Sequence, residues 1–172
     1  GCGGVGLNCI QGAVLAGALR IIAIDTVESK LSLATQFGAT EVVDASTGDV
    51  VQKVIDMTDG GVDYSFEAIG LKDTAEQCYE MLRPAGTATI IGMIPEGTKI
   101  EIDAGSFLRR ERKIQGSSMG SNRFRTDMPK YIEFYKQGRL KLDELVSQHL
   151  RLDQLNQAFT DMKSGSVARS VI

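Results

Sequence analysis

The chain has 172 residues, of which 42% are hydrophobic and 24% charged, as in an ordinary globular protein with its own core. Its 19 basic and 22 acidic side chains are interspersed and give a net charge of −3, which argues against nucleic acid as a partner. The apolar runs are too short to cross a membrane, and no signal peptide is recognisable. Cys2, Cys9 and Cys78 lack Cys-x-x-Cys spacing, so we expect neither a disulfide framework nor a zinc knuckle, and a cytoplasmic location.

Helix-like and strand-like segments alternate along residues 5–92. Helices are predicted where apolar residues recur every three or four positions, and strands where short apolar runs are continuous. The predicted helices cover residues 5–18, 29–37, the stretch from Asp49 to the Gly60-Gly61 pair, and 73–82. The predicted strands cover residues 20–25, 41–44, 62–69 and 87–92. This rhythm with short connections predicts an α/β fold, a doubly wound parallel sheet with helices on both faces.

The pattern is looser after Pro95. An edge strand is predicted from Lys99 to Asp103 and a further strand over residues 113–118. Two more helices are predicted over residues 126–137 and 153–163, ended by Gly138 and Gly165. A shift in composition near Met119 predicts a boundary between one domain of residues 1–118 and a second part of residues 119–172.

The first residues match the glycine pattern G-x-G-x-x-G at Gly1, Gly3 and Gly6. The first glycine permits a tight turn, the second lets the backbone approach a pyrophosphate, and the third allows close packing of helix on strand. The N-terminus of the following helix would then hold the phosphates. The pattern is weak alone, but the helix that follows and an acidic residue after the next strand support it.

That acidic residue is Asp25, which ends the apolar run RIIAID. A carboxylate at this position accepts hydrogen bonds from the adenosine ribose and repels a 2′-phosphate, which favours NAD over NADP. The alternative is an N-cap for the helix near Ser29. The strand that should precede Gly1 is not part of the sequence, so we expect the sheet to lack its first strand and the chain to be a segment of a longer protein.

The order and spacing of several segments resemble the zinc-dependent medium-chain alcohol dehydrogenases. They are GCGGVGLNCIQGAVLAGA, RIIAID, GATEVVD, GGVDYSFEAIG, LRPAGTATIIGM and VARSVI, and together they cover essentially the whole chain. The resemblance implies a Rossmann domain that binds NAD, followed by the C-terminal part of a catalytic domain. It implies reversible hydride transfer between an alcohol or aldehyde and NAD, with zinc in the parent enzyme as a Lewis acid.

Several cofactor contacts are implied by position. The glycine turn matches the pyrophosphate site, the end of the strand from Val62 flanks adenine and ribose, and the ends of the two later strands supply backbone partners of the nicotinamide carboxamide. The complete set is Gly1, Gly3, Gly4, Val5, Gly6, Asp25, Lys30, Ala68, Ile69, Gly70, Ile91, Gly92, Met93, Ser117, Ser118, Met119 and Arg169. Lys30 would lie beside the adenosine ribose, unless it is an ordinary solvated lysine. Arg169 would reach the pyrophosphate with its guanidinium fork, unless it is a surface residue near a chain end.

The catalytic residues and zinc ligands of the resembled family lie before the glycine loop, so none is assigned in this chain. The cysteines are interpreted as small packed residues, and His149, the only histidine, as structural. Asp63 and Glu67 are interpreted as orienting or packing groups under the cofactor rather than an acid/base couple.

Two other functions remain open. One is a zinc-free quinone or enoyl reductase of the same superfamily, which Asp25 disfavours because such enzymes typically take NADPH. The other is a non-catalytic nucleotide-binding domain. The resemblance also implies a homodimer formed through the edge from Lys99 to Asp103. The identity of the alcohol or aldehyde substrate is not encoded in this segment.

Overall fold

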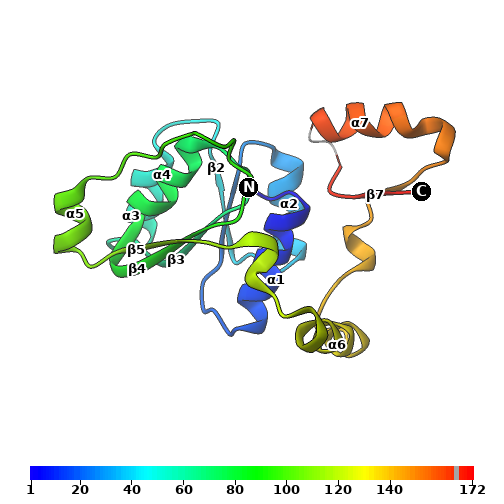
Figure 1. The fold of residues 1–172 in the computed structure, drawn as a ribbon, viewed down its shortest axis with the longest axis horizontal. Helices are drawn as coiled ribbons and strands as arrows, with labels where there is room; N and C mark the ends of the chain where they lie inside the picture. Colours follow the sequence, from blue (N-terminus) through cyan, green and yellow to red (C-terminus); the bar gives the residue numbers. More distant parts are fainter. Residues whose placement is uncertain (165–166) are drawn as a thin grey trace.

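The structure, a computed structural model, describes residues 1–164 and 167–172 as a layered α/β fold (Figure 1). The helices are α1 (Gly4–Leu15), α2 (Glu28–Gln36), α3 (Val50–Met57), α4 (Lys72–Glu80), α5 (Ala104–Arg109), α6 (Phe124–Lys136) and α7 (Leu155–Ser164). The strands are β1 (Ile22–Asp25), β2 (Glu41–Asp44), β3 (Val62–Glu67), β4 (Leu82–Ile90), β5 (Lys113–Gly116), β6 (Gln148–His149) and β7 (Ser170–Val171). Short 3-10 turns, η1 (Ser118–Ser121), η2 (Asp143–Leu145) and η3 (Leu152–Gln154), complete the list.

The predicted alternation of helices and strands is confirmed up to β4. β1 pairs with β2, and β4 pairs with both β3 and β5, all in parallel. The order is therefore β2-β1 in one sheet and β3-β4-β5 in another, and the described strands include no pairing between β1 and β3. In the predicted doubly wound order, the first strand of the fold would lie between β1 and β3.

Helices cover both faces of the sheet, as expected for a doubly wound fold. Residues of α1 and α2 pack on one face of β1, where Leu7, Leu31 and Ala23 are almost completely buried. Residues of α3 pack on the other face with β2, where Val43 and Val54 are buried. Successive residues of a strand point to opposite faces, which is why a short, continuous apolar run suits β1.

β4 begins earlier than the strand predicted over residues 87–92. Leu82 pairs with Val62, but the next pair joins Tyr64 to Thr87, so the register shifts between them. Ala85 in the extra stretch has a φ of 62°. A bulge of this kind accommodates Pro84, which cannot donate to a ladder.

The predicted edge strand from Lys99 to Asp103 is wrong as a secondary-structure assignment. The segment forms no ladder with the described strands. Instead the amide of Glu101 donates to Oε1 of Glu76 at 2.7 Å, and Glu101 forms an ion pair with Lys72. The carboxylate of Asp103 caps α5, a helix that the sequence did not predict, by accepting from the amide of Ser106.

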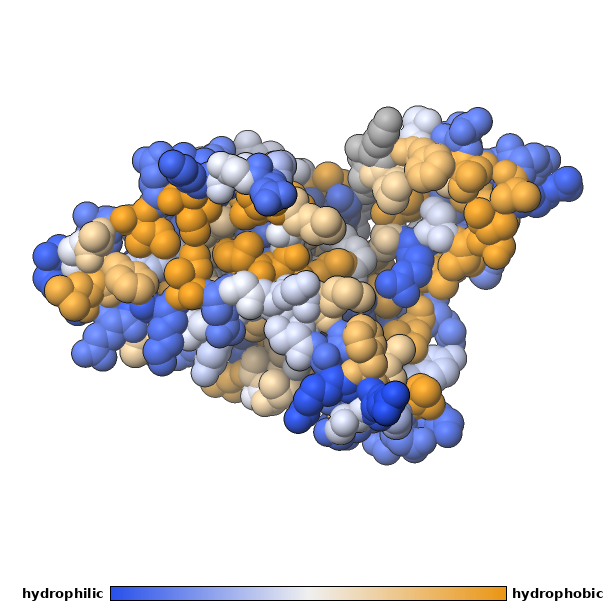
Figure 2. Space-filling view, in the orientation of Figure 1, coloured by the Kyte–Doolittle hydropathy of each residue, from blue (hydrophilic) through white to orange (hydrophobic). Residues whose placement is uncertain are grey.

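The C-terminal part contacts the layered domain through α1. The side chain of Gln11 exchanges two hydrogen bonds with the backbone of Lys141, and Leu145 is completely buried in the core beside α1. Beyond this anchor, α7 and β7 stand apart from the sheet (Figure 1). Apolar side chains gather on this lobe (Figure 2), where Phe159 and Met162 are largely exposed.

The two predicted C-terminal helices correspond to α6 and α7. Gly138, with a φ of 68°, follows α6 as predicted, whereas Gly165 lies outside the described residues. In the described part of the chain, no helix is long and apolar enough to span a membrane.

Candidate functional site

The glycine loop forms a tight turn between residues 1 and 6. A Cβ atom on Gly6 would overlap the carbonyl group of Gly1, and one on Gly1 would overlap the side chain of Ile69. A Cβ atom on Gly3, in contrast, would meet no atom within 4 Å. Gly6 is therefore required by packing, whereas a side chain at Gly1 would need that of Ile69 to shift. Gly3 faces open space into which a ligand could come close to the backbone.

The N-terminus of α1 opens onto this space. Gly3 is its N-cap, and no side chain caps the helix. The first backbone amides of a helix lack intrahelical partners, and the helix dipole gives them positive character. No acidic residue occupies the first turn, and Val5 in that turn is 53% exposed. The loop and helix therefore form a site suited to an anionic group such as a pyrophosphate.

Asp25 is buried at the carboxyl end of β1 and is tied to the glycine loop. Its Oδ2 atom accepts from the amide of Cys2 at 2.8 Å, and its Oδ1 atom accepts from the amides of Thr26 and Val27 at 2.9 and 3.0 Å. An ionised carboxylate has about four lone-pair sites, so room remains for a further donor. The alternative role of Asp25 as a helix N-cap is not supported. The N-cap position of α2 is occupied by Val27, and no side chain caps this helix.

Lys30 lies in the first half of α2, close to the same loop. Burial raises the pKa of the Cys2 thiol in the loop, and the positive charge of Lys30 acts against that rise. Lys30 forms no ion pair with any other described residue. The half-buried side chain of Lys30 is therefore available to a ligand.

The ends of β3 and β4 meet beside the glycine loop. The amides of Ile91 and Gly92 donate to the carbonyl oxygen of Glu67 at 2.9 and 3.0 Å. Gly70 has a φ of 98°, and a Cβ atom on it would lie 2.8–2.9 Å from the backbone of Met93. The segments of residues 68–70 and 91–93 are thus in direct backbone contact.

Asp63 and Glu67 were interpreted as orienting or packing groups rather than an acid/base couple, but only Glu67 has the surroundings of such a group. Asp63 is exposed and pairs with Arg83. Glu67 is only 2% exposed, and its Oε1 atom accepts three hydrogen bonds, one of them from the hydroxyl of Thr74. The resemblance implied an orienting role for Glu67, but nothing in the sequence marked Thr74 as its partner.

The end of β5 continues the same edge of the sheet. The amide of Ser117 donates to the carbonyl oxygen of Ile90 at 2.9 Å. From Ser118 the chain enters a left-handed turn in which Met119 has φ 48° and ψ 36° and Ser121 has a φ of 49°. Such conformations are unfavourable for residues other than glycine. Met93 and Met119 are 94% and 75% exposed at this edge.

The segment that carries Arg169 belongs to the C-terminal part and lies beside the glycine loop. Its backbone pairs with Ser147, and the carbonyl oxygen of the preceding Ala168 would lie 3.1 Å from a Cβ atom on Gly4. The side chain is exposed and forms no ion pair with the described residues. The structure therefore brings together the glycine loop, Asp25 and the ends of β3, β4 and β5, with the backbone of residues 168–169 beside the loop.

The residues expected not to bind metal are dispersed. Cys2 and Cys78 are buried and Cys9 is half-buried, in agreement with their interpretation as packed residues. His149 is exposed in the short pairing of β6 with β7. The described residues contain no group of three histidine, cysteine, aspartate or glutamate side chains placed to hold a metal ion.

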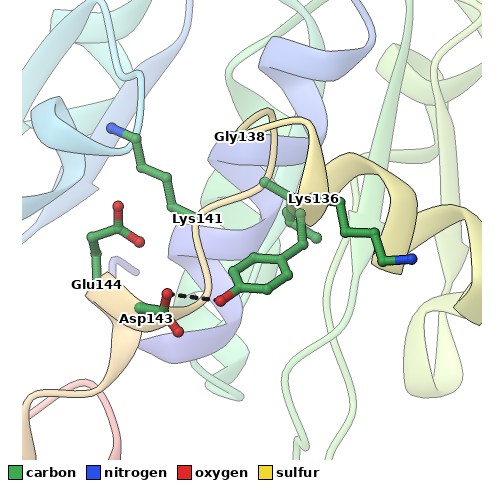
Figure 3. Close-up of a pocket in the computed structure, with 7 residues that line it drawn as sticks. Lys136, Gly138, Lys141, Asp143 and Glu144 are labelled. Carbon is green, nitrogen blue, oxygen red and sulfur yellow. Dashed lines mark hydrogen bonds between the residues drawn. The ribbon is translucent and has the colours of Figure 1, made fainter.

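A polar hollow follows α6, away from the glycine loop. Its lining includes Lys136, Lys141 and Glu144, and the hydroxyl of Tyr135 donates to Asp143 at 2.8 Å across it (Figure 3). None of the predicted cofactor residues lines this hollow. It therefore does not compete with the glycine loop as the cofactor site.

Comparisons with known proteins agree with this geometry. The model of a family described as zinc-binding dehydrogenase matches residues 4–137. The S-(hydroxymethyl)glutathione dehydrogenase of Komagataella pastoris is 39% identical over 181 residues, covering all of this chain and 46% of the relative. The crystal structure of benzyl alcohol dehydrogenase from Acinetobacter calcoaceticus has a TM-score of 0.94 at 34% identity, over 99% of this chain and 47% of that one.

A third comparison bears on the cofactor. A protein of Sinorhizobium meliloti 1021 solved bound to NADP has a TM-score of 0.83 at 30% identity, over 92% of this chain and 46% of that one. The chain spans about half the length of the relatives that it matches.

Proposed function

Because the chain belongs to the zinc-binding dehydrogenase family, we propose that it is the NAD-binding part of an alcohol dehydrogenase. The observation that carries the proposal is the convergence of the glycine loop, Asp25 and the ends of β3, β4 and β5 at one edge. In parallel α/β sheets, cofactors bind outside the carboxyl ends of the strands. We assign residues 1–118 to the dinucleotide-binding domain and residues 119–172 to the C-terminal part of a catalytic domain.

The glycine loop and its neighbours would hold the pyrophosphate and the adenosine half of NAD. Gly3 leaves space for the phosphates at the N-terminus of α1. Asp25 would accept from a ribose hydroxyl, with Lys30 beside it. Arg169 would add a bidentate contact to the phosphates, because its exposed guanidinium group follows Ala168, which touches the loop.

The ends of β4 and β5 would orient the nicotinamide. Backbone groups of residues 91–93 and 117–119 are available to the carboxamide, with Met93 and Met119 exposed beside them. When bound, NAD supplies the hydride acceptor for alcohol oxidation. The described residues offer no ligand set that fits zinc, so we assign no step through that metal to this chain.

NAD is proposed rather than NADP because of Asp25. A carboxylate facing a 2′-phosphate in a partly desolvated site should cost about 2 kcal/mol, close to a thirtyfold loss of affinity. The NADP-bound protein of Sinorhizobium meliloti shows that this fold also accepts the phosphorylated cofactor, so the choice depends on side chains. Asp25 likewise disfavours the NADPH-dependent, zinc-free reductase.

We further propose a small alcohol or aldehyde substrate and a cytoplasmic homodimer. In the stretch from Lys99 to Asp103 the charged residues are exposed, and its backbone could pair with its twofold-related copy if the bond from Glu101 to Glu76 opened. Replacing Glu101 with alanine keeps the backbone amide of residue 101 and should leave the dimer intact. Replacing it with proline removes that amide and should weaken the dimer. Sedimentation at micromolar concentration would measure this. A monomeric parent protein would contradict the proposal.

The function is tested in the full-length protein that contains this chain. NADH binding, followed by the change in cofactor fluorescence, should be at least about thirtyfold tighter than NADPH binding. Alcohol oxidation should require NAD and should disappear after zinc is chelated. Equal affinity for the two cofactors would contradict the assignment of Asp25, and turnover that survives metal removal would favour the zinc-free reductase.

A further inference from the structure

Glu67 collects an unusual number of hydrogen bonds at the end of β3. Its Oε1 atom accepts from the amide of Ile69, the amide of Gly70 and the hydroxyl of Thr74, each at 2.8 Å. The side chain is only 2% exposed. One carboxylate oxygen therefore fixes the backbone of residues 69–70 and the first turn of α4.

The same residue also holds the neighbouring segment through its main chain. Its carbonyl oxygen accepts from the amides of Ile91 and Gly92. Five donors from two loops and one helix thus converge on Glu67. These loops are the segments of residues 68–70 and 91–93, which the proposed function places at the adenosine side and the nicotinamide side of the cofactor.

The two segments have no room to move closer together. A Cβ atom on Gly92 would overlap both the amide nitrogen of Gly70 and Oε2 of Glu67. A Cβ atom on Gly70 would in turn crowd the backbone of Met93. The carboxylate therefore fills the space that Gly92 leaves, and its position sets the spacing of the two backbones.

This arrangement is a poor choice for stability alone. Oε2 of Glu67 is buried without a hydrogen-bond partner, and no cation among the described residues pairs with the side chain. Burying a carboxylate with an unsatisfied oxygen is costly, and well-packed apolar residues often replace such groups without loss of stability. A role in orienting its neighbours explains why a carboxylate, rather than an apolar side chain, occupies this position.

We propose that Glu67 is a positioning residue that sets the distance between the segments of residues 68–70 and 91–93. The inference rests on the proposed function, because those segments matter only if they flank the two halves of NAD. A ligand that touches both segments needs their spacing, whereas a ligand that occupies the adenosine half alone needs it much less. Loss of Glu67 should therefore weaken binding of the whole dinucleotide more than binding of its adenosine fragment.

The experiment compares the dissociation constants of NADH and 5′-AMP in the full-length protein. Glu67→Leu removes the acceptor for three donors, so NADH should bind at least tenfold more weakly. The affinity for 5′-AMP should fall less than threefold. Glu67→Gln keeps one acceptor oxygen and should recover most of the NADH affinity. Thr74→Val removes a single donor and should shift NADH binding two- to threefold in the same direction, which keeps the test available if Glu67→Leu does not fold.

Ser65→Ala is the matched control on the same strand. Ser65 is also buried, and its hydroxyl donates to the carbonyl oxygen of Cys78 at 2.6 Å, but it touches neither segment. Its loss should change NADH and 5′-AMP binding by the same small factor. Equal losses for the two ligands in the Glu67 and Thr74 variants would overturn the inference. If the unaltered protein bound neither ligand, the proposed function itself would be wrong.

Discussion

Replacing Asp25 with alanine should lower both stability and cofactor affinity, because the carboxylate has two tasks. It accepts from the amide of Cys2 in the glycine loop and from the amides of Thr26 and Val27. The proposed ribose contact uses what acceptor capacity remains. The loop that approaches the pyrophosphate therefore depends on the same side chain that selects NAD.

The magnitude can be estimated from the bonds that are lost. Cys2 is only 2% exposed, so its amide would be left unpaired in the interior, which costs about 1–3 kcal/mol. The amides of Thr26 and Val27 are closer to solvent and can bond to water, so each adds about 0.5–1 kcal/mol. A total of about 2–5 kcal/mol corresponds to a fall in melting temperature of about 4–20 °C for a chain of this size.

Asp44→Ala is the control, because Asp44 ends β2 directly opposite Asp25 in the parallel ladder. It accepts one exposed backbone hydrogen bond, from Ser46. Thermal unfolding without cofactor, followed by NADH titration, should show a clear loss of stability and at least about tenfold weaker binding for Asp25→Ala only. If the two variants were equally stable, the bond from Cys2 to Asp25 would not support the glycine loop, and the reasoning would fail.

Three further predictions follow from burial and space. Gly3→Val should abolish NADH binding with little change in melting temperature, whereas Gly6→Ala should destabilise the fold. Thermal unfolding and NADH titration would measure both effects, and the reverse pattern would refute the phosphate site. Arg169→Lys should weaken NADH binding about three- to tenfold, since lysine lacks the bidentate fork, and should leave binding of adenosine, which carries no phosphate, unaffected. Burial raises the pKa of the Cys78 thiol from 9.0 to about 11, so the unfolded thiol ionises first. The free energy of unfolding, measured with urea, should therefore fall as pH rises from 9 to 11, and more steeply than in the Cys78→Ala variant. Parallel pH profiles for the two proteins would contradict this.

The regular elements could be predicted because their signals are local. The apolar run before Asp25 and the helical spacing of Leu31 and Ala34 correspond to β1 and α2, whose apolar residues are buried in one core. Gly38, which follows the predicted helix of residues 29–37, has a φ of 110° and lies just after the end of α2. The glycine loop and Asp25 could also be found, since their spacing reflects the strand and helix lengths between them.

The remaining features depend on contacts between distant residues. Alternating Ile100 and Ile102 resembled an edge strand, but the competing bond from Glu101 to Glu76 is set by tertiary packing that the local sequence does not reveal. The carboxylate of Glu67 was expected to orient its surroundings, yet its three donors and unpaired oxygen follow only from how β3 and β4 meet. Local patterns therefore located the site, and the fold decided how it is held together.

The bond from the amide of Cys2 to Oδ2 of Asp25 links the glycine loop to the carboxyl end of β1 in the interior of the protein. A buried, hydrogen-bonded amide exchanges its hydrogen with water only when the surrounding structure opens, so exchange at Cys2 would report the local opening of the proposed cofactor site. A dinucleotide that binds only the closed loop would slow this exchange, and the extent of the slowing would measure its binding free energy.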